Sequence, residues 1–344
     1  LKDNVYTCNK CGQKMFVQNT KGDRDDWENY KYAYFTNLND AMAAATEDGW
    51  TVKLLDNIDD IGRGIDIYEK NSGTQTITLD LNGKNITGSY PIWIGKPNGN
   101  IISTTTLKIV GSGDISLGGR ALVVSEKSTL NLEGWTRGSI DAVSVNCNGN
   151  TGDEGSLIVG ENDDVYIGRL LYQTWSLNTI AKAKLSGGTY GRIEIGLTDY
   201  QSPGILFGAL LAPGYAFQYA DGSGSFVNYA TKATYDADGV ISNVKVVRCT
   251  SHVDAKSVDA DGNITDGTDN LCDYCNADLT ADTVATLTVD GKTYFYTDLP
   301  SALDKANVTK GTITIKLLKD VTGLKQQLKL GDFSSWTDNN TILD

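Results

Sequence analysis

Long apolar runs and concentrated positive charge are both missing from this sequence of 344 residues. No run of about 18 apolar residues occurs, so no segment predicts a membrane-spanning helix, and we expect no membrane insertion. Lys and Arg number 30 against 43 Asp and Glu, which gives a formal charge of −13 without a visible basic patch. A nucleic-acid backbone would therefore be repelled, and we expect no nucleic-acid partner.

Proline is also scarce, at 5 residues, whereas glycine reaches 37, and Asn, Asp, Thr and Ser supply most of the polar residues. This composition is typical of turn-rich β proteins. The length exceeds one average domain and predicts two or three units. The sequence opens at Leu1 without Met and stops at Asp344 inside an apolar run, so we expect a piece of a longer exported protein.

A tandem duplication organises the chain. Three blocks recur in the same order: the segments around Leu38 and Leu299, the segments around Leu54 and Leu317, and the Cys-x-x-Cys pairs at Cys8 and Cys272, at offsets of 261, 263 and 264. The first block predicts a short amphipathic helix, since Leu38, Ala41, Met42 and Ala45 follow helical spacing. We expect this helix, with the apolar strand after it, to form a cap.

Short β-rich stretches recur between the two copies. Their anchor residues, Leu79, Leu107, Leu130, Leu157 and Leu185, are separated by 28, 23, 27 and 28 residues. Such steps favour a right-handed parallel β-helix over a sandwich, in which turns come every 8–12 residues or so. A lone coil cannot bury its apolar face, so several coils must stack between about residues 76 and 196.

The pattern changes from about residue 204 to 247, where Asp238-Gly239 predicts a hairpin and an antiparallel end to the solenoid. We therefore expect four parts. They are the tail of a preceding linker (1–16), a β-helix repeat unit (17–248), a zinc-knuckle-like linker (249–282) and the start of a second, truncated β-helix repeat (283–344).

Cysteine and histidine residues gather in the predicted linker. Cys249-Thr-Ser-His252 is followed by 19 residues and then by Cys272-Asp-Tyr-Cys275. Two such pairs bring four soft donors together and predict a structural zinc site. The segment has few apolar residues to offset an ordering cost of about 1–2 kcal/mol per residue, and structural zinc supplies roughly 10–16 kcal/mol. Disulfides, which export favours, and free thiols remain the alternatives.

Cys8 and Cys11 have the spacing of the second half of such a site. His252 is the only histidine of the chain and already stands in the later pair. We interpret Cys8 and Cys11 as the end of a preceding linker, without ligand partners in this sequence.

The motifs for catalysis are incomplete. Acidic pairs occur at Asp25-Asp26, Asp59-Asp60 and Asp163-Asp164, and two acids about 5–10 Å apart can cleave glycosides. A β-helix hydrolase also needs a Gly-His-Gly segment, which is missing, and a lyase would have to use Asp163, Asp164 and Arg169. Solvated turn residues are the simpler interpretation of these acids, and we predict no enzyme activity.

Residues of the kind that anchor protein interfaces crowd into one predicted coil. Tyr166, Arg169, Tyr172 and Trp175 fall within ten residues, and Arg192 lies one coil later. Tyr, Trp and Arg dominate binding hot spots, so these five residues are the predicted partner-binding site. Packing inside the solenoid is the alternative.

The assembled motifs resemble repeats of large adhesin-like surface proteins of gut Gram-positive bacteria. They are the Cys-x-x-His and Cys-x-x-Cys linker, a Tyr-x-Asp-Leu-x-x-Ala-Leu helix, an Ile-Thr-Leu-Asp-Leu-Asn-Gly strand and turn, and a Leu-Leu-Ala-x-Gly-Tyr-Ala-Phe segment. The resemblance extends over nearly all of the chain. Pro213 and Asn276 depart from the pattern, where Glu and Gly are expected.

This resemblance implies display at the bacterial cell surface, beside neighbouring repeats of the same chain. It also implies binding of a host protein, with immunoglobulin as the leading guess, or of a mucosal glycan. A structural stalk spacer is the alternative, and a carbohydrate-active β-helix enzyme of the polysaccharide lyase type is the second alternative.

Overall fold

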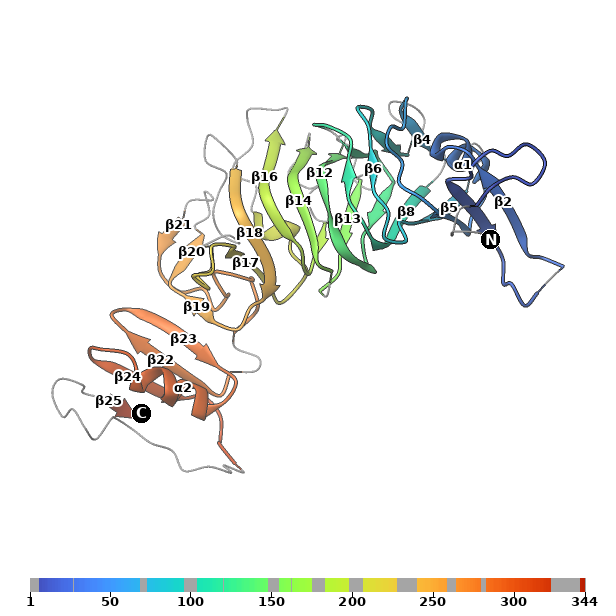
Figure 1. Ribbon diagram of the computed structural model, residues 1–344. Coiled ribbons are helices and arrows are strands. Elements are labelled where there is room, and N and C mark those ends of the chain that lie inside the picture. Colours follow the sequence, from blue (N-terminus) through green and yellow to red (C-terminus); the bar gives the residue numbers. More distant parts are fainter. Residues whose placement is uncertain are drawn as a thin grey trace.

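The structure is a computed structural model, and it confirms the predicted fold class: the chain is mainly β, with a β-solenoid of about four turns. It describes residues 6–26, 28–68, 73–95, 104–119, 121–147, 155–161, 163–174, 183–197, 207–227, 240–258, 264–279, 283–322 and 341–343. Figure 1 shows the solenoid coils in a row between β1–β2 at one end and β17–β18 at the other, with the β22–β24 unit beyond.

One face of the solenoid is a parallel ladder that carries the predicted leucine anchors. Its strands are β3 (Trp50–Leu54), β5 (Thr74–Asp80), β8 (Thr104–Ser112), β11 (Thr129–Asn131), β13 (Ser156–Val159) and β15 (Lys184–Leu185). Leu107, Leu130 and Leu157 lie directly opposite one another, as expected. The first and last anchors are two residues out of register, because Ile77 faces Leu107 and Val159 faces Leu185.

A second face is formed by another set of parallel strands. They are β4 (Ile65–Ile67), β7 (Ile92–Ile94), β10 (Leu122–Val124), β12 (Trp135–Cys147), β14 (Val165–Thr174) and β16 (Thr189–Leu197). The short strands β6 (Ile86–Thr87) and β9 (Ile115–Ser116) continue it. A buried column of like side chains runs through the coils: Ile58, Ile86, Ile115, Ile140, Ile167 and finally Tyr190. Branched side chains of one shape stack well at this spacing, which favours a parallel register.

Both ends of the solenoid are capped. At the start, β1 (Val17–Lys21) pairs with β2 (Lys31–Phe35) and β3. The helix α1 (Leu38–Ala44) buries three of the four residues predicted from helical spacing, and the fourth, Ala45, is buried as its C-cap. Asn37 caps this helix by accepting from the N–H of Asp40. At the other end, after a 3-10 turn (Phe207–Leu210), β18 (Val240–Arg248) lies antiparallel to β16 and to β17 (Tyr215–Tyr219). The antiparallel end is therefore confirmed, while Asp238-Gly239 lies outside the described residues.

A smaller unit repeats the order of the first cap. It consists of β22 (Ala285–Val289), β23 (Lys292–Tyr296), α2 (Leu299–Asn307), β24 (Ile313–Leu317) and β25 (Thr341–Leu343). The first strand pairs with the second and the third in both copies, and Ala285 faces Leu317 as Val17 faces Leu54. The duplicated sequence blocks thus form one duplicated ββαβ arrangement. No helix in the described ranges has the length and apolar character of a membrane span.

Candidate metal centre

Four side chains between the solenoid and the second unit converge on one point. Cys249 directly follows β18, and His252 begins β19 (His252–Asp254). Cys272 and Cys275 lie in a tight turn 20 residues or more further along the chain. The ligand atoms of all four lie within 4.8 Å of one another, so the cluster can hold a metal ion.

The three cysteines of the cluster form no disulfide. The Sγ atoms of Cys249 and Cys272 are 3.8 Å apart, well beyond the sulfur–sulfur bond of about 2.05 Å. His252 Nδ1 lies 3.7 Å from Cys249 Sγ and 3.6 Å from Cys275 Sγ. The predicted spacing thus brings all four residues together, and the disulfide alternative has no support at this cluster.

Local backbone structure explains why the Cys-x-x-Cys segment turns here. The N–H of Asn276 donates to the carbonyl of Cys272 over 2.8 Å, and the N–H of Cys272 donates to the carbonyl of Ala277 over 2.9 Å. Asn276 takes a left-handed conformation with φ of 57°, which asparagine tolerates better than most residues. This conformation suits asparagine at a position where the sequence resemblance predicts glycine.

Two buried aspartates join the halves of the cluster. Asp254, on β19, accepts from the N–H of Asp269 at 3.1 Å and from the N–H of Asn270 at 2.7 Å. Asp273 accepts from the N–H of Ala255 at 3.1 Å, while its own N–H donates to the carbonyl of Val253 at 2.7 Å. Both carboxylates are fully buried, so these bonds fix the histidine strand against the cysteine turn.

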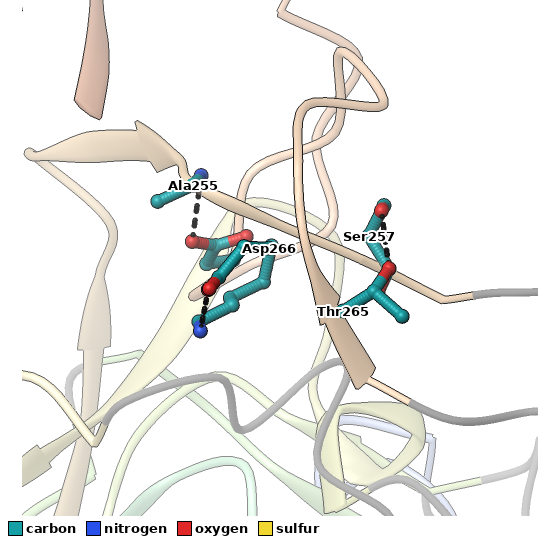
Figure 2. A network of polar contacts seen from close by, with 6 residues as sticks. Ala255, Ser257, Thr265 and Asp266 are labelled. Carbon is teal, nitrogen blue, oxygen red and sulfur yellow. Dashed lines mark hydrogen bonds and ion pairs between the residues drawn. The ribbon is translucent and has the colours of Figure 1, made fainter. Parts of the chain in front are cut away.

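The segment between the halves forms a hairpin of β20 (Lys256–Val258) and β21 (Ile264–Asp266). Figure 2 shows its cross-strand contacts: the hydroxyls of Ser257 and Thr265 lie 3.0 Å apart, and Lys256 forms an ion pair with Asp266. The hairpin shortens the path from His252 to Cys272, which lowers the entropy cost of bringing the two pairs together.

Proton positions in the metal-free cluster follow from its short contacts. Hydrogen bonds with Cys272 and Cys275 raise the pKa of His252 to about 10. The hydrogen bond between Cys249 and Cys272 raises the pKa of Cys249 and lowers the pKa of Cys272. These shifts favour a proton on His252 and on Cys249 over a proton on Cys272 in the metal-free cluster. A metal ion would replace these protons.

The cluster is attached to the end of the solenoid. The N–H of Cys249 donates to the carbonyl of Gly214 over 2.9 Å. The ring of Tyr274, within the cysteine turn, stacks on Phe226 with centroids 5.1 Å apart. Next to Cys249, Arg248 forms an ion pair with Glu161, with Nη2 2.7 Å from Oε2.

The cluster is also attached to the second unit. Strand β19 pairs antiparallel with β23, and His252 lies opposite Phe295. The Phe295 side chain packs in the same apolar cluster as the three cysteines. This sheet crosses the boundary predicted at residue 282, so the linker and the second unit share one sheet.

Three of the predicted partner-binding residues lie on the outside of neighbouring strands. Tyr166 and Arg169 are on β14 and Arg192 is on β16, with Arg169 opposite Arg192. Both arginines form ion pairs with Glu194, which the sequence analysis missed, and Arg169 Nη2 lies 2.7 Å from Glu194 Oε2. The hydrogen bonds from Arg169 lower the pKa of Glu194. The alternation of side chains along β16, which places Glu194 on the same side as Arg192, was the available signal.

Tyr172 was wrongly placed in the partner-binding site. Its side chain is fully buried within the solenoid. The pairing of β12 with β14 skips Gly168, where the strand turns a corner, so the alternation that starts at Tyr166 changes parity. Leu170 and Tyr172 consequently point inward. Trp175 lies outside the described residues.

Two of the candidate catalytic acids, Asp163 and Asp60, accept hydrogen bonds from glycine N–H groups. Asp163 accepts from the N–H of Gly160 at 2.6 Å and from the N–H of Gly134 at 3.1 Å. Asp60 accepts from the N–H of Gly62 at 2.9 Å. The bonds from Gly160 and Gly62 span two or three residues, as in turns, whereas the bond from Gly134 joins neighbouring coils.

Comparisons with known proteins leave the resemblance as a prediction. No family model, no curated protein and no solved structure matches the chain. The geometry of the cluster therefore carries the functional argument.

Proposed function

We propose that the chain is a structural module in which a zinc centre locks one β-solenoid unit to the next. One observation carries the proposal: the four ligands come from both sides of the junction. Cys249 directly follows the last strand of the solenoid, and His252 begins a strand of the sheet that belongs to the second unit. An ion bound to both fixes their relative position.

Zinc is the ion that this donor set fits best. A tetrahedron with zinc–sulfur bonds of about 2.3 Å and zinc–nitrogen bonds of about 2.0 Å has sulfur–sulfur edges of about 3.8 Å and sulfur–nitrogen edges of about 3.5 Å. The cluster has 3.8 Å between Cys249 Sγ and Cys272 Sγ, and 3.6 Å between Cys275 Sγ and His252 Nδ1. Four protein ligands fill the coordination sphere and leave no position for substrate, which is typical of a structural site.

The small core around the cluster supports a structural role for the ion. Apart from the cysteines, its buried members are Ala216 and Leu279. Such a core contributes only a few kcal/mol at about 25 cal/mol per Å², whereas structural zinc contributes roughly 10–16 kcal/mol. The ion would therefore dominate the stability of the junction.

A non-catalytic repeat of this kind suits a stalk or array displayed outside a bacterial cell, which is the location that the sequence resemblance implies. The duplicated ββαβ arrangement supports the tandem part of this proposal. The turn contacts of Asp60 and Asp163 support a role without catalysis.

Small-angle X-ray scattering tests the lock. The zinc-loaded chain should scatter as one elongated rigid particle, whereas chelation or Cys272→Ser should broaden the distribution of distances at the junction. Cys11→Ser removes an exposed cysteine from the other Cys-x-x-Cys segment, at Cys8 and Cys11, and is the matched control. Its scattering should be like that of the native chain. Identical scattering before and after loss of zinc would contradict the proposal.

Binding of a host macromolecule on the lateral face is a second candidate function. Tyr166 is 46% exposed, and it lies across Gly191, where a Cβ would come within 2.5 Å of its hydroxyl. With Arg169, Arg192 and Glu194 it forms an aromatic and charged group on adjacent strands, which is the composition of an interface anchor.

A pull-down of intestinal proteins, immunoglobulins included, beside a glycan array tests this second function. Tyr166→Ala should reduce capture by about tenfold or more, because a hot-spot aromatic contributes at least about 1–2 kcal/mol. Tyr90→Ala, which removes an exposed tyrosine elsewhere, is the control. Equal capture by both variants and the native chain would exclude the lateral face.

A further inference from the structure

The Cys8–Cys11 turn has the backbone structure of the turn that carries Cys272 and Cys275. Three hydrogen bonds recur at an offset of 264 residues. In the first turn, backbone N–H groups donate to carbonyl oxygens from Cys8 to Gln13 (2.8 Å), from Gly12 to Cys8 (2.8 Å) and from Met15 to Tyr6 (2.7 Å). In the second turn, the corresponding bonds run from Cys272 to Ala277 (2.9 Å), from Asn276 to Cys272 (2.8 Å) and from Leu279 to Asn270 (2.9 Å). Gly12, with φ of 72°, takes the left-handed conformation of Asn276.

The strand beside the turn is also equivalent in the two copies. The duplicated ββαβ arrangement makes β2 the counterpart of β23, and Tyr34 the counterpart of Phe295. Tyr6 stacks on Tyr34 with ring centroids 5.9 Å apart, which places the Cys8–Cys11 turn next to β2. Phe295 likewise packs against the cysteines of the metal centre.

The two cysteine turns and the strands beside them differ in solvent exposure. The outer edge of β23 pairs with β19, whereas β2 pairs only with β1 among the described strands. Tyr32 is 63% exposed and Tyr34 is 41% exposed. Cys11 is exposed and Cys8 is partly exposed, whereas Cys272 and Cys275 are buried. The first copy thus presents two thiols beside an uncovered strand edge with exposed aromatic side chains.

We propose that this turn and the outer edge of β2 are one half of a second metal site, which an extended Cys-x-x-His strand from a further unit of the same kind completes. The incoming strand pairs antiparallel with β2, and its histidine lies opposite Tyr34, as His252 lies opposite Phe295. Its cysteine and histidine complete a tetrahedral set with Cys8 and Cys11. Asn9 stands in sequence where Asp273 accepts a backbone N–H, and its amide oxygen is an acceptor too.

The occupant is identified by the intact centre. Residues 249–254 show the segment that fits a turn of this structure, and within this chain Cys249 and His252 already lie beside Cys272 and Cys275. A free Cys-x-x-His strand must therefore come from another unit. The inference rests on the zinc centre proposed above.

The experiment adds a Cys-x-x-His segment, the other half of the proposed second metal site, to the full chain. At an offset of 264, Leu1 corresponds to Thr265, so a copy of residues 249–264 joined in front of Leu1 restores the continuous sequence of a complete site. Metal content is counted by native mass spectrometry under reducing conditions with zinc, and the cobalt(II) absorption spectrum reports tetrahedral thiolate coordination. The expected result is one ion in the native chain and two in the extended chain.

Matched variants separate the possible results. Cys11→Ser in the extended chain should return the count to one, and the remaining ion shows that the chain is still folded. One ion in both the native and the extended chain would overturn the second site alone. No ion in the native chain would instead refute the centre at Cys249. Two ions in the native chain would overturn the proposed occupant, because Cys8 and Cys11 would then bind metal without the added strand.

Discussion

At the scale of single residues, we expect Asp254 to position the candidate metal ligands and so to set the affinity for zinc. Its buried carboxylate accepts two backbone N–H groups from the segment that leads to Cys272. Asp254→Ala leaves both donors without this acceptor, which costs about 1.5–3 kcal/mol, and groups that orient ligands change metal affinity about 10–100-fold. Zinc affinity, measured by competition with a chelator, should fall by that factor.

Asp266→Ala is the control for this prediction. Its side chain is 90% exposed in an ion pair with Lys256, and exposed pairs contribute little. Equal losses of affinity in the two variants would show that the buried bonds of Asp254 do not position the ligands.

Proton release is a second prediction at this scale. At pH 7 the metal-free chain holds a proton on His252, whose pKa is raised to about 10 by its bonds to Cys272 and Cys275, and on Cys249, whose pKa is also raised. Zinc binding should release at least about two protons, and the number should fall above about pH 10, where His252 is already neutral. Calorimetry in buffers of different ionisation enthalpy measures the number, and binding without proton release at pH 7 would contradict the assignment.

The four candidate metal ligands could be predicted from the sequence, whereas the buried aspartates that position them could not. Two x-x-separated pairs and one histidine identify Cys249, His252, Cys272 and Cys275 from spacing alone. Asp254 and Asp273 look like ordinary turn acids in a chain of 43 acidic residues, and only the folded hairpin shows that they are buried.

At the scale of secondary-structure elements, the corner in β14 determines which aromatic residues are available for binding. Tyr172→Ala removes a fully buried ring and should cost about 3–5 kcal/mol of unfolding free energy. Tyr166→Ala, on the outer face of the same strand, should change stability by less than about 0.5 kcal/mol. Urea unfolding of the two variants checks this, and similar losses would contradict the change of parity at Gly168.

The stacking of parallel coils could be predicted from the sequence, whereas the register between their strands could be predicted only in part. The leucine spacing predicts stacked parallel strands because each coil must bury the same apolar face. It cannot show that Ile77 rather than Leu79 faces Leu107, since β5 alternates apolar and polar residues and either alignment buries the same face. The number of residues between successive strands of this face sets the register, and this number differs from coil to coil.

At the scale of the whole molecule, the junction is the feature that unites sequence, fold and proposed function. The duplication predicts a second unit, and the structure shows a strand of the linker within the sheet of that unit. The proposed metal centre lies where this sheet meets the last turn of the solenoid, through Cys249, Gly214 and the stacked rings of Phe226 and Tyr274. A long array built in this way would owe its stiffness to its metal centres.

The most direct test of a zinc-locked junction is an X-ray absorption spectrum at the zinc edge of the purified chain. We predict about three sulfur ligands at about 2.3 Å and one nitrogen ligand at about 2.0 Å, which is the set supplied by Cys249, Cys272, Cys275 and His252. A chain purified without zinc and with its thiols oxidised, or a spectrum dominated by oxygen ligands, would contradict the account.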